Sequence, residues 1–181
     1  MVFNSDEKLV KAVKDGCIDS FGCLYKQYYN SIAALAYSVT GDKDLAQDAA
    51  QETFAIAWQR ITCLKDNTKF GAWLAGICRN VAKQMLRYKQ KLTLHDNLDI
   101  IKDDHNVDNH DEAIRKIVWQ LKAFDREPVV LRYYDGLSYE KISQTLGISQ
   151  QAVNGRLLRA KKKIEKQLKK QGITGVNYET S

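Results

Sequence analysis

Apolar residues recur at three- and four-residue steps along most of this chain, which is the spacing of amphipathic α-helices. In the first half of the chain this spacing predicts four helices, over residues 6–14, 19–39, 42–60 and 70–89. Gly16 and Gly41 separate the first three helices, and a loop over residues 62–69 precedes the fourth. The second helix is expected to bury one face, formed by Phe21, Leu24, Tyr25, Tyr28, Ile32, Leu35, Ala36 and Val39.

The pattern changes over residues 91–110, where no apolar period is sustained and five aspartates stand against two lysines. We interpret this stretch as a flexible acidic linker. Helical spacing returns over residues 111–170, and we expect residues 171–181 to form a loose tail. The sequence therefore predicts an all-α fold with two small helical domains, 1–90 and 111–170, joined by the linker. Each domain is small enough to be only marginally stable alone.

The sharpest local signal lies in the second domain, over residues 137–163. A helix over residues 138–146 turns Ile142 and Leu146 inward, and Gly147 follows at a position where helices end in the left-handed conformation. Ser149 is placed to cap a second helix through its side-chain oxygen. Together these features predict a helix-turn-helix, whose second helix enters the major groove of DNA.

The second helix of this motif has two unlike faces. Its buried stripe is expected to consist of Val153, Leu157, Ala160, Ile164 and Leu168. On the other face, amide side chains suit adenine edges, and arginines and lysines suit phosphates or guanine. We therefore expect duplex DNA to be bound by Ser138, Ser149, Gln150, Gln151, Asn154, Gly155, Arg156, Leu158, Arg159, Lys162 and Lys163. For residues 166–170 a solvated lysine-rich helix remains an equal alternative.

Composition narrows the class of protein. The formal net charge of +6 favours polyanionic partners, although charge alone is weak evidence. The four cysteines form no CxxC pair and have no histidine at metal-ligand spacing, so we expect reduced thiols used as small apolar residues. The sequence shows no signal peptide and no apolar run long enough to insert in a membrane, which favours a soluble cytoplasmic protein. We expect no enzyme, and no catalytic residue, metal, cofactor or small-molecule substrate.

Motifs in both domains point to one family. Residues 44–54 read DLAQDAAQETF, Trp58 follows one turn later, and residues 70–74 and 77–80 read FGAWL and ICRN. In the second domain, residues 129–142 read VVLRYYDGLSYEKI. In this order, these motifs resemble conserved regions 2 and 4 of the extracytoplasmic-function (ECF) sigma factors of bacterial RNA polymerase. The resemblance covers residues 6–168 and implies a factor that directs promoter recognition and transcription initiation.

The resemblance implies three partners: core RNA polymerase, promoter DNA and an anti-sigma protein that masks the same surfaces. The polymerase contact would be made with the β′ clamp helices and the β subunit. On the third helix it implies docking through Asp44, Asp48, Gln51, Glu52 and Ala55, opposite residues such as Leu45, Phe54 and Trp58 that are suited to packing. Gln47 stands where the family often has glutamate, so one charge is missing. A merely solvated acidic face is the alternative.

For the melted strand of the −10 element, the resemblance implies contacts from Lys65, Asn67, Lys69, Arg79, Asn80, Lys83 and Arg87. Loop 62–69 and Asn80 would form the pocket for an unstacked base, and basic side chains would neutralise phosphates. The loop reads TCLKDNTK and lacks an aromatic residue on which a base could stack. We expect Trp73 to belong to the core rather than to serve as that platform.

The resemblance assigns the −35 element, as duplex, to the helix-turn-helix residues named above. Residues 151–156 read QAVNGR, whereas the family commonly has a glycine-threonine pair before the valine and lysine-serine-arginine after it. The scaffold positions match and the DNA-facing ones differ, which predicts a promoter sequence of its own. Gly155 costs a helix roughly 1 kcal/mol relative to alanine. Close approach of the backbone to DNA would explain it, and so would drift.

Two other classes of protein remain to be separated from this one. A conventional helix-turn-helix regulator would use residues 1–90 for dimerisation or ligand binding, and would bind two half-sites without polymerase. An enzyme would need a metal site in the linker. Its ligands would come from His95, Asp96, Asp103, Asp104, His105, Asp108, His110 and Asp111, a spacing that matches no ligand template.

Overall fold

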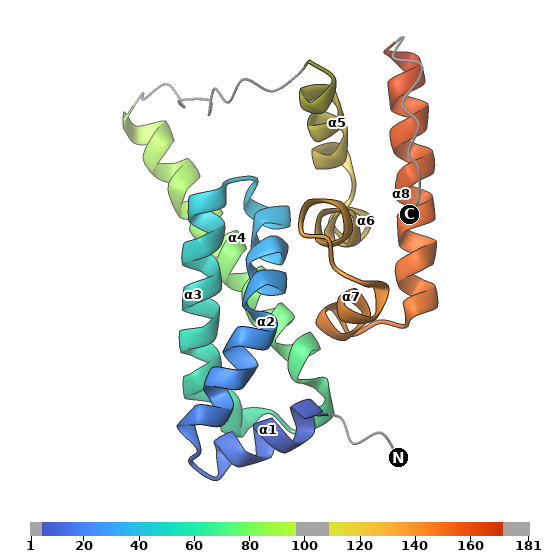
Figure 1. The fold of residues 1–181 in the computed structure, drawn as a ribbon. Helices are drawn as coiled ribbons and strands as arrows, with labels where there is room; N and C mark the ends of the chain where they lie inside the picture. Colours follow the sequence, from blue (N-terminus) through green and yellow to red (C-terminus); the bar gives the residue numbers. More distant parts are fainter. Residues whose placement is uncertain (1–4, 97–108, 172–181) are drawn as a thin grey trace.

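The computed structural model describes residues 5–96 and 109–171, and within these ranges all the regular elements are helical (Figure 1). The elements are α1 (Ser5–Lys14), α2 (Ile18–Thr40), α3 (Lys43–Arg60), η1 (Ile61–Cys63), η2 (Asn67–Lys69), α4 (Phe70–Asp96), α5 (Asn109–Gln120), α6 (Ala123–Val129), η3 (Val130–Tyr134), α7 (Tyr139–Leu146) and α8 (Gln150–Lys170). The all-α fold predicted from the sequence is confirmed. None of the described helices is long and apolar enough to cross a membrane.

Helices α1–α4 form the first bundle, with α2, α3 and α4 packed on one another and α1 across one end (Figure 1). Their starts and ends follow local chemistry. Gly41 ends α2 with φ 70°, and the Asp42 carboxylate caps α3 by accepting a 2.9 Å hydrogen bond from the backbone N–H of Leu45. The predicted buried face of α2 is right except at Tyr25. That residue is 36% exposed because its ring packs at the edge of the bundle, 4.7 Å from the ring of Phe54.

Helix α4 is longer than predicted. It continues past residue 89 to Asp96, into the segment that the acidic composition marked as linker. Residues 90–96 contain neither glycine nor proline, so nothing in their backbone chemistry stops the helix. The remaining linker residues, 97–108, and the tail residues 172–181 lie outside the described residues.

Helices α5–α8 form the second bundle, and its helix-turn-helix matches the prediction. All five residues of the predicted stripe on α8 are buried. Gly147 adopts φ 68° after α7, and Ser138 and Ser149 cap α7 and α8 by accepting hydrogen bonds from backbone N–H groups three residues on. These features were predictable because each depends on residues within one or two helical turns.

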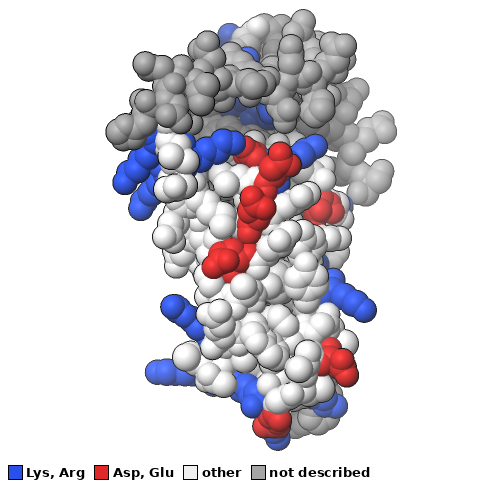
Figure 2. All heavy atoms as spheres, turned by 90° about the vertical axis from the view of Figure 1, so that its left-hand side faces the viewer, with Lys and Arg blue, Asp and Glu red and all other residues white. Residues whose placement is uncertain are grey.

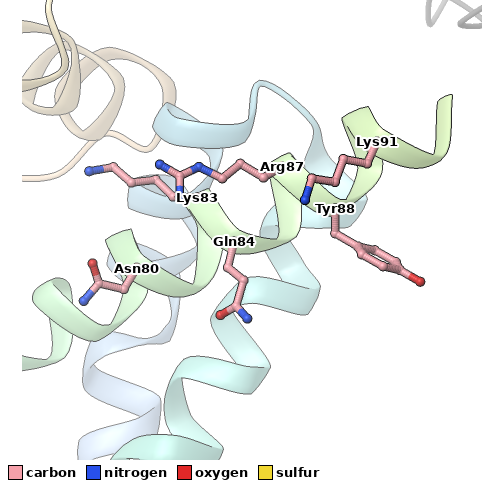
Figure 3. A pocket seen from close by; sticks show the side chains of 6 residues that line it. All are labelled: Asn80, Lys83, Gln84, Arg87, Tyr88 and Lys91. Atoms are coloured by element: carbon pink, nitrogen blue, oxygen red, sulfur yellow. The ribbon is translucent and has the colours of Figure 1, made fainter. Parts of the chain in front are cut away.

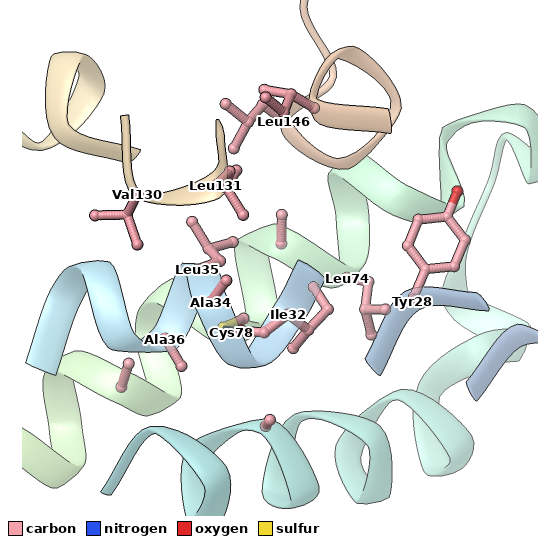
Figure 4. Close-up of a cluster of buried hydrophobic side chains, with 14 of the residues drawn as sticks. Tyr28, Ile32, Ala34, Leu35, Ala36, Leu74, Cys78, Val130, Leu131 and Leu146 are labelled. Carbon is pink, nitrogen blue, oxygen red and sulfur yellow. Dashed lines mark hydrogen bonds between the residues drawn. The ribbon is translucent and has the colours of Figure 1, made fainter. Parts of the chain in front are cut away.

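The two bundles share one continuous apolar core. Val130 and Leu131 of η3 lie over Leu35 of α2, and Leu146 of α7 closes the same cluster (Figure 4). At the far edge the Trp119 ring packs 5.3 Å from that of Tyr37. The sequence predicted two separate domains, and it gave no sign of this interface because the residues that form it read as ordinary core positions of each bundle.

Helices α4 and α7 approach each other through glycines. A Cβ placed on Gly71 would lie 2.6 Å from the backbone oxygen of Gln144, and one on Gly147 would lie 2.5 Å from Cβ of Ala72. The contact is extended by Lys141, whose ammonium lies 3.9 Å from the centre of the Tyr28 ring. Partial burial lowers the pKa of Lys141. The bundles therefore touch backbone to backbone at this point.

The cysteines divide into two kinds. Cys78 is buried as expected for a small apolar residue, and burial raises the pKa of its thiol to about 12. Cys17, Cys23 and Cys63 are exposed, so the expectation that all four serve as apolar packing residues is wrong for these three. Each lies at a helix end or on an outward face, where the apolar period does not reach.

Candidate nucleic-acid interface

Helix α3 presents an acidic outer face. All five residues expected to dock on polymerase, Asp44, Asp48, Gln51, Glu52 and Ala55, are exposed. The opposite side, which includes Ala49, Ala50 and Phe54, is buried in the bundle. Acidic side chains follow one another down this face of the molecule (Figure 2). Trp58, which the sequence marked as suited to packing, is 42% exposed and packs edge-on against the Phe21 ring, with 5.0 Å between the ring centres. It lies in the last turn of α3, where the core no longer covers it.

Helix α4 carries an open groove of about 670 Å³ on its exposed face (Figure 3). Three residues predicted to bind the melted strand, Asn80, Lys83 and Arg87, line it. The sequence reasoning missed its other three lining residues, which are Gln84, Tyr88 and Lys91. A signal for two of them was present, because Gln84 follows Asn80 and Lys91 follows Arg87 by four positions and so shares its side of the helix, while Tyr88 in turn follows Gln84 by four.

Arg79 does not face this groove. Its guanidinium donates two hydrogen bonds to the carboxylate of Glu127 on α6, with N–O distances of 2.8 and 2.9 Å. Glu127 is buried, and this bidentate bond raises the pKa of Arg79. The pair joins the first bundle to the second. We call this arrangement, in which the two bundles pack on each other, the closed arrangement. In it the Arg79 charge is already neutralised within the chain.

The loop residues lie apart from the groove. Asn67 accepts a 2.7 Å hydrogen bond from the ammonium of Lys14, Lys69 forms a 3.2 Å ion pair with Asp66, and Lys65 is exposed. These residues precede α4, and Asn80 follows ten residues into it, which is about 15 Å along the axis. The groove contains Asn80 and none of the loop residues. The expected pocket of loop and Asn80 is thus not assembled in the closed arrangement.

The predicted DNA-facing side of α8 is open. Gln150, Gln151, Asn154, Leu158, Arg159, Lys162 and Lys163 are exposed, and Gly155 and Arg156 are half-buried. The two serines of the predicted set, Ser138 and Ser149, already hold backbone N–H groups as caps. Around Gly155 the nearest atom to an added Cβ would be Nη1 of Arg159 at 3.8 Å. The part of the chain that the structure describes therefore gives no packing reason for glycine at this position.

Two basic residues of α8 are held by one buried carboxylate. Asp125 of α6 is fully buried; it accepts a 2.5 Å hydrogen bond from the Lys163 ammonium and lies 3.6 Å from Nε of Arg159. The latter distance makes the Arg159 contact an ion pair without a hydrogen bond. Arg156 donates to the backbone oxygen of Phe124 at 3.4 Å. These contacts hold the basic side chains along the outer face of α8 before any DNA is bound.

Within the described residues, no group of three or more His, Cys, Asp or Glu is placed to hold a metal ion. Four residues of the metal alternative, Asp103, Asp104, His105 and Asp108, lie outside the described residues.

Comparison with known proteins gives the same division of the chain. Residues 24–92 match the model of Sigma-70 region 2, and residues 111–164 match that of Sigma-70, region 4. The chain is 29% identical over 165 residues to RfaY of Xanthomonas campestris pv. campestris, named as a sigma factor of RNA polymerase; the match covers 84% of this chain and 41% of RfaY. The chain thus spans about two fifths of RfaY.

Other relatives match along nearly their whole length. SigW of Bacillus subtilis, named as an ECF RNA polymerase sigma factor, is 28% identical over 180 residues, which cover 90% of this chain and 96% of SigW. The solved structure of CnrH in complex with the cytosolic domain of CnrY superposes with a TM-score of 0.61 and 25% identity. That match covers 92% of this chain and 99% of CnrH.

Proposed function

Because the chain belongs to the ECF sigma factors of the sigma-70 family, we propose that it binds core RNA polymerase and directs it to promoters for transcription initiation. The observation that carries this proposal is the presence of two unlike basic faces on one chain. Helix α8 belongs to a helix-turn-helix suited to a duplex, while α4 has an open groove of basic and amide side chains suited to a single strand. A protein that only binds duplex DNA needs one of these faces.

We assign the roles as follows. The exposed acidic face of α3 docks on the β′ clamp helices of polymerase, where basic partner groups would complement Asp48 and Glu52. The exposed side of α8 reads the −35 element in the major groove. Asn80, Lys83 and Arg87 hold the melted −10 strand. An anti-sigma protein that covers these same faces would keep the factor inactive.

The closed arrangement adds a condition to this function. For Arg79 to reach DNA, its two hydrogen bonds to Glu127 have to break, and parting of α4 from α6 would break them. Polymerase can supply the free energy if it binds the open form more tightly than the closed one. Binding to core enzyme and exposure of Arg79 are therefore coupled steps.

The test of the docking face is a charge reversal, Asp48→Arg with Glu52→Arg. Both side chains are exposed, so the variant should fold normally by circular dichroism and yet fail to co-purify with core polymerase. A matched control, Glu7→Arg with Asp15→Arg, makes the same charge change at exposed positions in and beside α1 and should bind normally. Wild-type retention of the α3 variant would show that α3 is not the docking face.

Run-off transcription with core polymerase, on the promoter upstream of the factor's own gene, tests the function as a whole. The wild-type chain should start transcription at a defined site. A chain that binds duplex DNA as a dimer and gives no transcript with core enzyme would instead be a conventional helix-turn-helix regulator.

A further inference from the structure

The exposed face of α4 is organised as two parallel rows. Along one row the residues are Asn80, Gln84 and Tyr88, and along the other Lys83, Arg87 and Lys91, each four positions apart. Four residues advance an α-helix by about 6 Å and turn it only slightly past a full circle, so side chains at this spacing stay aligned. Figure 3 shows Gln84 and Tyr88 pointing to one side of the helix axis and the three cations to the other.

The cationic row has no counter-charge among the described residues. None of Lys83, Arg87 and Lys91 makes an ion pair within the part of the chain that the structure describes. Neighbouring cations on the same helix do have partners: Arg79 pairs with Glu127, and Lys89 with Asp42. A row of cations that the fold leaves without counter-charges is suited to an external polyanion.

The row of Asn80 and Gln84 ends in Tyr88, whose aromatic ring is mostly exposed. Tyr88 is 66% exposed, more than any other aromatic side chain among the described residues, and its ring meets no other ring there. Gln84 and Asn80 precede it with amides that can each donate and accept hydrogen bonds. A ring and two amides, beside a row of cations, match an unstacked nucleotide strand whose bases face one row and whose phosphates face the other.

We propose that Tyr88 is a base-stacking residue of the −10 site, and that Gln84 and Asn80 contact base edges while Lys83, Arg87 and Lys91 contact phosphates. This proposal rests on the proposed function and extends it to three residues. Tyr88 supplies the stacking platform that loop 62–69 lacks. The ligand has to be single-stranded, because in a duplex the faces of the bases are already stacked on one another, and the proposed function makes it the melted DNA strand.

The experiment measures binding of holoenzyme, reconstituted from core polymerase and each variant, to a fluorescent single-stranded oligonucleotide of the non-template −10 sequence. Tyr88→Ala should weaken binding about tenfold, the lower part of the range for loss of one stacked base. Tyr88→Phe should bind like wild type, because it keeps the ring and loses only the hydroxyl. Tyr133→Ala is the matched control, since Tyr133 is also exposed, at 60%, but lies on η3.

Salt dependence separates the two rows. Tyr88→Ala and Gln84→Ala should lower affinity without changing the slope of log affinity against log salt concentration. Lys83→Ala and Lys91→Ala should each reduce that slope by about 0.7, the value for one phosphate contact on a single strand. A Tyr88→Ala variant with wild-type affinity, a Tyr88→Phe variant as weak as the alanine one, or a reduced slope for Tyr88→Ala would each overturn the proposal.

Failure of the proposed function can be distinguished from failure of the stacking role of Tyr88. If the wild-type chain does not form holoenzyme, or the holoenzyme gives no transcript even from a premelted template, the function is wrong. If the wild-type holoenzyme is active and Tyr88→Ala binds the strand as well as it does, only the stacking role is wrong.

Discussion

Two basic side chains form ion pairs with carboxylates of α6 that are two residues apart. Lys163 of α8 pairs with Asp125, and Arg79 of α4 pairs with Glu127. The first pair lies inside the second bundle, and the second pair connects the two bundles. If the bundles parted, the Asp125 pair would move with α8, while the Glu127 pair would be lost. In both pairs the charge of a predicted DNA contact is neutralised within the chain, but only the Arg79 pair also connects the two bundles.

The largest expected effect comes from breaking the pair between bundles. Arg79→Ala should lower the free energy of unfolding by about 2–3 kcal/mol, below the range for a fully buried pair because Arg79 is partly exposed. Glu127→Gln should also destabilise the chain, yet free Arg79 to bind DNA and so raise affinity for the single strand. Urea unfolding of both single variants and the double variant measures the coupling. Simply additive losses would mean that the two side chains do not interact.

The second largest effect is expected for recognition of the −35 duplex by α8. Arg159→Ala should weaken binding to the −35 duplex by about 1–3 kcal/mol if its guanidinium reaches a base edge. Lys166→Ala should reduce only the salt slope, by about one unit at most. Fluorescence titrations on the −35 duplex and on a scrambled duplex compare the two. If both variants lost the same affinity on the −35 duplex and on the scrambled duplex, Arg159 would contact a phosphate and would not recognise a base.

A smaller effect is expected at Asn80 on α4. Asn80→Ala removes hydrogen bonds worth about 1 kcal/mol, or roughly fivefold in binding, and little packing, since the side chain is exposed. Polymerase binding and −35 recognition should persist while open complex forms poorly. Permanganate reactivity of thymines near the start site measures this, and a premelted bubble should restore part of the activity. Normal reactivity would leave loop 62–69 to read the flipped base.

The smallest effect concerns the exposed pair at the other end of α4, where Lys89 donates to Asp42. This bond, followed by the backbone N–H of Leu45, lowers the pKa of Asp42. Because the folded-state pKa is depressed, the stabilisation is present above the ordinary aspartate pKa of about 3.9 and is lost as pH falls through the lower folded value.

Asp42→Asn keeps the helix cap and removes this charge, so it should cost about 0.5 kcal/mol at pH 7. The cost should vanish in strong acid. Thermal unfolding at both pH values checks the difference, and a cost independent of pH would assign the effect to the cap rather than to the Lys89 pair.

The two basic helices also differ in how far the sequence could predict them. Around α8 the buried stripe, the Ser149 cap and the left-handed Gly147 were predicted, because each depends on neighbours a few residues away. On α4 the sequence pointed to Arg79 as a DNA contact, since a basic residue on a polar face looks free until its partner from another bundle is known. Tyr88 was missed because aromatic residues usually pack, and only its exposure reveals otherwise. The end of α4 was predicted too early, at residue 89, because the acidic composition of residues 91–110 suggested a linker although residues 90–96 contain no helix breaker.

Gly71 and Gly147 bring backbone against backbone, or against a single methyl group, in part of the joint between α4 and α7. Glycines have no rotamers to fix on contact or to release on parting, so they keep the ordering cost of this joint below that of an interface made only of long side chains. Gly147 needs its left-handed conformation, but Gly71 does not, and its replacement by alanine would place one methyl group against both the Gln144 carbonyl and the Tyr28 ring. The absence of a Cβ atom at Gly71 of α4 therefore sets how closely the two bundles can pack on each other.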